Sequence, residues 1–217
     1  KCWSGLRSRR LPTRQNSGMV AINLGFLVLG FAVGSSSLTF NWVLEHRAAV
    51  NYFPEFAGRV VYLSDILVIA GIFIWLGGRL LVGDYRCRFG LWYVGAPLLT
   101  LLSLSALSVL WAADQSQAAA VTLRGVVLLA LYLVTANGPR KAALLMIIGL
   151  FLVGLLQAGV SLAQKALGGP VGLSFLGELS IGHLYFPLIG QPRAVGLGFS
   201  PNPAATYMAV VSSIAFA

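Results

Sequence analysis

The sequence predicts an all-α fold: a polytopic helical membrane protein with five complete transmembrane helices and a truncated sixth. Apolar residues make up 58% of the 217 residues and charged residues only 10%, whereas soluble domains carry about 25% charged residues. The mean hydropathy is correspondingly high, at +0.84. The apolar runs are continuous and lack the two-residue alternation of barrel strands, so helices are the structure that satisfies their backbone in lipid.

Five of these runs are long enough to cross a bilayer, which takes ~20 residues in a helix. They cover residues 19–40, 60–82, 89–112, 118–136 and 142–167. A sixth run begins near residue 203 and is incomplete at residue 217, so we expect the chain to be part of a longer protein. The first run is too long for a cleavable signal peptide, and further spans follow it.

Lysine and arginine residues predict how the spans are oriented. With a basic cytoplasmic tail at residues 1–18, ten cations fall on the cytoplasmic side and four on the outer side, while Arg124 stays within a span. The ten are Lys1, Arg7, Arg9, Arg10, Arg14, Arg79, Arg86, Arg88, Arg140 and Lys141, and the four are Arg47, Arg59, Lys165 and Arg193. The positive-inside rule therefore predicts a cytoplasmic amino terminus and a large extracytoplasmic loop at residues 168–202. This orientation accounts for the net charge of +9 without a nucleic-acid partner.

The sequence predicts neither a metal site nor a cofactor. No Cys/His ligand spacing, HExxH, GxSxG or Walker-type loop occurs in it. The two cysteines, Cys2 and Cys87, fall in predicted cytoplasmic segments, and we expect both to be free thiols.

Arg124 lies about two turns into the fourth predicted span, counted from its outer end. A cation inside a span costs ~2.5–3.5 kcal/mol on insertion scales, so it should face protein, water or an anion. One interpretation is an arginine that extends to the interface, and the other is an anion contact near the outer surface. Asp65, near the outer end of the second span, is its expected partner if the two helices are neighbours, in a structural or a functional ion pair.

The large outer loop ends where the sixth helix is predicted to start. Asn202 is a suitable N-cap, and Pro203 suits the first helical position. The unpaired N–H groups and the positive dipole end of this helix then face outward, where they can bind an anion. Arg193, nine residues earlier, can fold back to them across a flexible loop that contains Gly196, and its guanidinium matches phosphate oxygens. The alternative is an ordinary helix entry beside a surface arginine.

The same loop holds His183 and a single acid, Glu178. A lone loop histidine without an evident partner is weak support for catalysis, so His183 is only a candidate substrate-binding residue.

Three stretches of the sequence resemble the O-antigen ligase and polymerase superfamily. They are Arg193-x-x-Gly196-x-x-x-x-Pro201-Asn202-x-x-Ala205 before a span, Ser108-Val-Leu-Trp111-Ala112-Ala-Asp114 before the span with Arg124, and Gly154-Leu-Leu-Gln157 before a glycine-rich loop. Together they cover roughly residues 100–210, and the first 100 residues match the family only in topology. Ser200 stands where members often have His or Asn.

The resemblance implies a GT-C-like, metal-independent membrane glycosyltransferase in the bacterial plasma (inner) membrane. Members move a glycan from an undecaprenyl-diphosphate carrier to an acceptor hydroxyl on lipid A–core, another glycan repeat or a protein, at the extracytoplasmic face. By position, Arg193 would contact the donor diphosphate, with Arg124 as a second candidate. Gly196, Pro201 and Asn202 belong to the same substrate-binding motif. The family's general base lies in a later outer loop, beyond residue 217.

Two other classes of function stay open on the sequence. Polar groups within spans also mark ion pathways, and relatives with this domain have been linked to inorganic-carbon uptake, so a transporter of a small solute is one alternative. A non-catalytic membrane scaffold is another. The spans contain few ionisable groups, which favours the enzyme over the transporter. The choice between ligase and polymerase is also left open.

Overall fold

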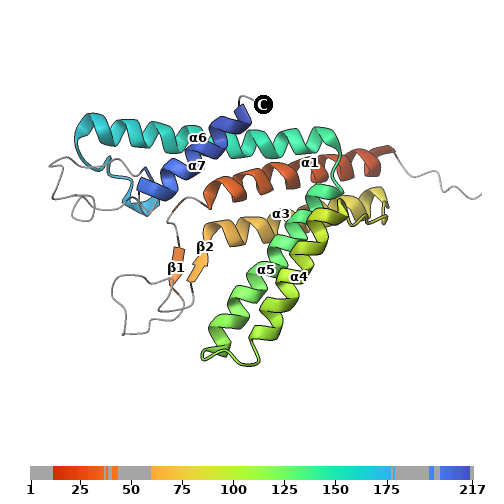
Figure 1. Cartoon of the computed structure of the whole chain (residues 1–217). Coiled ribbons are helices and arrows are strands. Elements are labelled where there is room, and N and C mark those ends of the chain that lie inside the picture. Colours follow the sequence, from red (N-terminus) through yellow and green to blue (C-terminus); the bar gives the residue numbers. More distant parts are fainter. Residues whose placement is uncertain are drawn as a thin grey trace, which may run out of the picture.

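The computed structural model describes residues 12–36, 38, 41–43, 60–176, 178, 196–197 and 201–215 (Figure 1). Helices dominate this part of the chain. They are α1 (Pro12–Ser35), α3 (Leu63–Val82), α4 (Trp92–Ser108), α5 (Gln115–Ala136), α6 (Arg140–Leu167), α7 (Pro201–Ala215) and the 3-10 turn η1 (Ser174–Leu176). Two three-residue strands, β1 (Asn41–Val43) and β2 (Val60–Tyr62), pair antiparallel with Trp42 opposite Val61.

Four of the described helices, α1, α3, α5 and α6, are long and apolar enough to cross a membrane. The predicted class of helical membrane protein is thereby confirmed at this level. The third predicted span, residues 89–112, is shorter: α4 has 17 residues and runs from Trp92 to Ser108. Helix length and composition therefore support four spans, and the fifth predicted span is not confirmed.

Local hydrogen bonds explain where the helices end. Gly83 closes α3 with φ of 70°, a conformation that costs glycine nothing, and its N–H donates to the Arg79 carbonyl at 2.7 Å. Asp114 caps α5 by accepting the Gln117 N–H at 3.0 Å, so this helix begins three residues before the predicted residue 118. Prediction placed Asn202 as the N-cap of the last helix and Pro203 in its first position; this was wrong by two residues, because α7 begins at Pro201. Proline suits a first helical position, and Asn202 then lies in the first turn.

Glycines bring α1 and α3 into backbone contact. A Cβ on Gly18 would lie 2.9 Å from the Gly78 carbonyl oxygen, and one on Gly25 would lie 3.0 Å from that of Gly71. Small residues let membrane helices approach this closely. The two pairs run in opposite order along the chain, so α1 and α3 are antiparallel.

The other side of α1 packs against α6, also through glycine. A Cβ on Gly30 would strike the Met146 carbonyl oxygen, and one on Gly34 would lie 2.7 Å from Cβ of Val153. These pairs run in the same order, so α1 and α6 are parallel. Figure 1 shows α1 between α3 and α6, with the α4–α5 hairpin extending away from this layer. In this layer α1 and α6 therefore run in one direction and α3 runs in the other.

The core lies at the centre of α1. Phe26 and Leu29 are completely buried and contact a cluster from α3, α5 and α6 that contains Val68, Trp75 and Val134. Many large apolar side chains of α3, α4, α5 and α6 are instead exposed. Such an apolar surface is favourable in contact with lipid and unfavourable in contact with water. This distribution agrees with the membrane class.

Candidate functional site

Charges are distributed unequally between the two ends of the bundle. One end holds the starts of α3 and α5 and the end of α6, and we call it the Asp65 end; the opposite end is the Asp84 end. Among the described residues, the Asp84 end carries the cations Arg14, Arg79, Arg86, Arg88, Arg140 and Lys141, and the Asp65 end carries Arg124 and Lys165. The acids are distributed in reverse, with Asp65, Asp114 and Glu178 at the Asp65 end and Asp84 at the other. Each end therefore has a distinct electrostatic character.

At the Asp65 end, Arg124 of α5 reaches the first turn of α3. Its guanidinium lies 3.4 Å from the Asp65 carboxylate and stacks over the Tyr62 ring at 4.9 Å from the ring centre. The same carboxylate accepts the Tyr62 N–H at 3.1 Å and so caps α3. The predicted pairing of Asp65 with Arg124 is confirmed.

This ion pair is open to solvent. The side chains of Arg124 and Asp65 are 44% and 32% exposed. An exposed pair contributes only about 0–1 kcal/mol to stability. The geometry therefore positions the guanidinium and leaves part of it accessible to a further anion.

Two glutamines of α6 hold the chain that leads into α7. The Gln164 side chain accepts the Gly196 N–H at 2.8 Å and donates to the Gly196 carbonyl at 2.9 Å. Two helical turns earlier on the same face, the fully buried Gln157 accepts the Leu197 N–H at 3.0 Å. We call these contacts the glutamine clamp. It fixes the 196–197 turn against α6, four residues ahead of the start of α7.

Gly196 is required by this clamp. Its φ is +63°, and a Cβ there would lie 2.8 Å from the Gln157 amide carbon. Any larger residue would be strained in the backbone and would collide with the clamp. The sequence suggested that Gly196 gives the loop flexibility near the substrate, but both of its main-chain polar groups are paired with Gln164. Its contact with substrate stays a prediction.

Glu178 is bound tightly beside the clamp. Its carboxylate accepts the N–H groups of Val171, Gly172 and Leu173 at 2.6, 2.9 and 2.6 Å, and the Gln164 amide at 2.8 Å. Burial raises the pKa of Glu178, but these hydrogen bonds outweigh it and hold the pKa below its ordinary value. Glu178 is therefore a fixed structural anion rather than a base.

The pKa of Glu178 predicts how the loop responds to pH. Its folded-state pKa lies below the ordinary value of 4.5, so the carboxylate stabilises the loop above that pH and ceases to do so as pH falls through the lower, folded value. We expect the amides of residues 171–173 to stay protected from hydrogen exchange at about pH 5 and to lose protection only below it. Glu178→Gln should remove this pH dependence. Loss of protection near neutral pH in the native protein would contradict it.

Gly154 and Leu150 of α6 support α7 itself. A Cβ on Gly154 would lie 3.0 Å from Val211, and the Tyr207 hydroxyl donates to the Leu150 carbonyl at 3.0 Å. Figure 1 shows α7 lying across α6. Beside this contact, α1, α5, α6 and α7 enclose an apolar groove of about 520 Å³, lined by Phe26, Val33, Ser36, Thr135, Ala143, Met146, Ile147, Leu150, Tyr207, Val210 and Ile214.

Several predicted site residues fall outside the residues that the structure describes. These are Arg193 and His183, and the side chains of Pro201 and Asn202, whose backbone forms the first turn of α7. Cys87 is an exposed free thiol, as predicted. In the described part of the chain, no three His, Cys, Asp or Glu side chains come together as metal ligands.

The glutamine clamp is the feature that sequence reasoning missed. Gln157 was noted only as part of a family stretch, and Gln164 was not noted at all. A signal was present, because two amides seven residues apart lie on one face of an otherwise apolar helix. Their partners lie 32 and 40 residues further along the chain, which no local pattern indicates.

The arrangement defines the class of the protein. It is a helical membrane protein with several spans, in which polar contacts at the Asp65 end attach an arginine to one helix and a loop to another. No protein-family model matches the chain, and neither a curated protein nor a solved structure matches it.

Proposed function

We propose that this chain is a membrane glycosyltransferase of the O-antigen ligase or polymerase type. It transfers a glycan from undecaprenyl diphosphate to an acceptor hydroxyl at the extracytoplasmic face of the bacterial inner membrane. One observation carries the proposal: stretches that suggested the family meet in space. Gln157 of the 154–157 stretch binds Leu197 of the 193–205 stretch at 3.0 Å, at the same end of the bundle as Arg124.

The topology proposed for this function places the Asp65 end outside. Most of the described cations lie at the Asp84 end, which the positive-inside rule assigns to the cytoplasm. We include α4 as a further span. Its 17 residues extend ~25 Å at ~1.5 Å each, and the turn at residues 109–111 extends it towards the ~30 Å of a hydrocarbon core.

The chemistry needs positive groups at the leaving diphosphate. The acceptor oxygen attacks the anomeric carbon, the bond from that carbon to the diphosphate oxygen breaks, and undecaprenyl diphosphate leaves with the bonding electrons. The acceptor proton passes to a general base. Arg193, Arg124 and the start of α7 provide fixed positive charge and dipole for the leaving group, in place of a metal. Asp65 orients Arg124, and His183 lies in the loop that contacts substrate.

Substitutions at Arg124 and Asp65 separate a substrate contact from a structural ion pair. We expect Arg124→Gln in the intact protein to lower the rate of glycan transfer about 100-fold, because a fixed charge at a developing anion is worth that much. Asp65→Asn removes the same ion pair but leaves the guanidinium, so its effect should be at least about tenfold smaller. Thermal unfolding of both variants provides the control for folding. Equal losses of activity in the two variants would mean that Arg124 acts only through the pair.

A further inference from the structure

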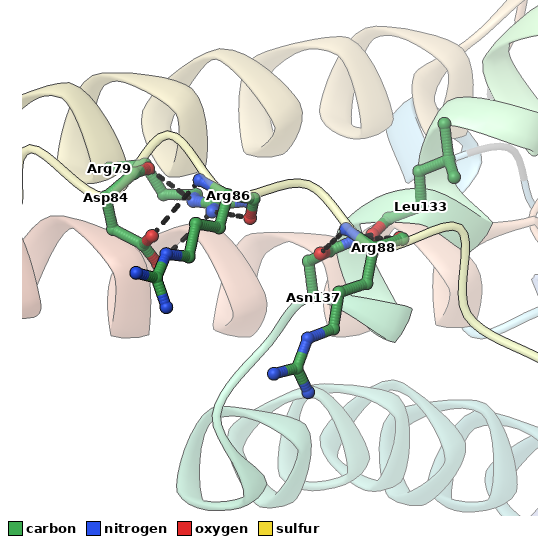
Figure 2. A network of polar contacts seen from close by, with 6 residues as sticks. All are labelled: Arg79, Asp84, Arg86, Arg88, Leu133 and Asn137. Carbon is green, nitrogen blue, oxygen red and sulfur yellow. Dashed lines mark hydrogen bonds and ion pairs between the residues drawn. The ribbon is translucent and has the colours of Figure 1, made fainter.

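The loop of residues 83–91, between α3 and α4, is held from its α3 side by one arginine (Figure 2). Arg79 donates to the Asp84 carbonyl at 3.1 Å and to the Arg86 carbonyl, and it pairs with the Asp84 carboxylate at 3.2 Å. Its guanidinium also stacks on Trp75, 5.0 Å from the ring centre. Arg79 is buried, so its charge is directed to the loop backbone and to Asp84, the one acid at this end among the described residues.

The other side of the loop is attached to the end of α5. Asn137 accepts the Arg88 N–H at 2.6 Å and donates to the Arg88 carbonyl at 2.7 Å, as a neighbouring strand would. The Tyr132 hydroxyl donates to the Leu91 carbonyl at 2.9 Å, and its ring meets Phe89 edge to face. The partners in these contacts are 41 to 49 residues apart in the chain. The contacts fix the loop backbone and use no charged side chain of the loop.

Apart from Arg79, the cations of this region have no acidic partner among the described residues. Arg86, Arg88, Arg140 and Lys141 are exposed, and Asp84 is already paired with Arg79. In Figure 2 the guanidinium of Arg88 points away from the bonds that hold its backbone. The Asn137 link sets Arg88 close to the 140–141 cations, because Asn137 directly precedes the turn into α6. Arg86 and Arg88 of the 83–91 loop therefore lie at the same end of the bundle as Arg140 and Lys141 of the first turn of α6.

Exposed aromatic side chains lie close in sequence to Arg86 and Arg88. Tyr85 is 74% exposed and Trp92 75% exposed, with Tyr93 beside them on the first turn of α4. Tyrosine and tryptophan concentrate at the headgroup level of a bilayer. Cations just outside a span attract anionic headgroups at the same level.

We propose that Arg86, Arg88, Arg140 and Lys141 form a binding site for the phosphate of an anionic phospholipid, with Tyr85 and Trp92 at headgroup depth. The loop is fixed before lipid arrives, so binding orders only side chains and loses little backbone entropy. The site lies at the opposite end of the bundle from Arg124 and does not depend on the proposed enzyme activity.

The test is a lipid titration of the intact protein in neutral detergent, with bound lipid counted by native mass spectrometry. Phosphatidylglycerol should bind and phosphatidylcholine should not. In Arg86→Gln/Arg88→Gln, affinity for phosphatidylglycerol should fall about 30-fold, since each cation near a headgroup contributes about five- to sixfold. Arg86→Lys/Arg88→Lys keeps the charge and should stay within about threefold of the native protein. Lys165→Gln, at the other end, should bind as the native protein does.

Three results would overturn the proposal. They are unchanged phosphatidylglycerol affinity in the double glutamine variant, equal binding of phosphatidylcholine, and displacement of the lipid by millimolar inorganic phosphate, which would indicate a site for free anions. Size-exclusion chromatography checks folding of the variants. In the described structure the side chains substituted at the proposed site make no hydrogen bond or ion pair, so we expect the profiles of these variants to match the native protein. If the Arg86→Gln/Arg88→Gln variant is misfolded, a second pair, Arg140→Gln/Lys141→Gln, replaces it in the comparison with the lysine variant. Unchanged phosphatidylglycerol affinity in that second pair would then overturn the proposal.

Discussion

Replacing Gly30 with alanine is expected to destabilise the bundle by about 3 kcal/mol, the upper part of the range for overpacking. The added Cβ meets the carbonyl oxygen of Met146, so a backbone rather than a flexible side chain has to move. Separating α1 from α6 also loosens the packing of Phe26 and Leu29, which are completely buried. Unfolding of the purified protein in a denaturing-detergent titration measures the effect.

The chain provides a matched control for Gly30. Gly159 lies on α6 and Gly77 on α3, and a Cβ on either meets nothing within 4 Å. Alanine at these two positions should be neutral or stabilising by up to about 1 kcal/mol, from helix propensity alone. If Gly30→Ala behaves like Gly159→Ala, then α1 and α6 are not in the backbone contact described above.

Replacing Arg193 with alanine in the intact protein is expected to reduce the rate of glycan transfer by about 10²–10³-fold, as for loss of one donor to a developing anion. The loss should be in turnover more than in donor binding, because the negative charge on the leaving diphosphate grows in the transition state. Arg193→Lys should keep part of the rate, since a point charge remains but the planar fork is lost.

The control for Arg193 is Lys165→Ala, which removes another exposed cation at the same end of the bundle. We expect that variant to transfer glycan at the native rate. If both variants lose activity equally, the effect is one of general surface charge. If neither loses activity, Arg193 does not contact the diphosphate.

The fold class was predictable because it follows from long apolar runs, and these need no knowledge of which helices touch. The pair of Asp65 and Arg124 was predictable for a related reason: two opposite charges near the same end of apolar helices have few other partners. The glycine contacts could also have been found. Gly18 and Gly25 on α1 are seven residues apart, as are their partners Gly71 and Gly78, and this spacing places each set on one helix face.

The rest depended on contacts between distant residues. The helix α4 begins at Trp92 rather than residue 89, directly after the loop whose backbone Arg79 and Asn137 bind, and it ends at Ser108 rather than residue 112. In the sequence, Asn137 is followed by Gly138 and Pro139, which indicates a helix end and no more. The glutamine clamp was missed because the seven-residue spacing of the two amides does not indicate what they bind. The role of the two glutamines becomes evident only in the folded structure, where the 196–197 turn lies against α6.

The account's central claim is tested most directly by reconstituting the intact protein in liposomes with labelled undecaprenyl-diphosphate oligosaccharide, chelator, and one of the three acceptors. We predict that label moves to an acceptor, with one undecaprenyl diphosphate released for each glycan transferred. The contradicting result is the absence of transfer to lipid A–core, to a glycan repeat and to protein, while labelled bicarbonate accumulates inside the same liposomes.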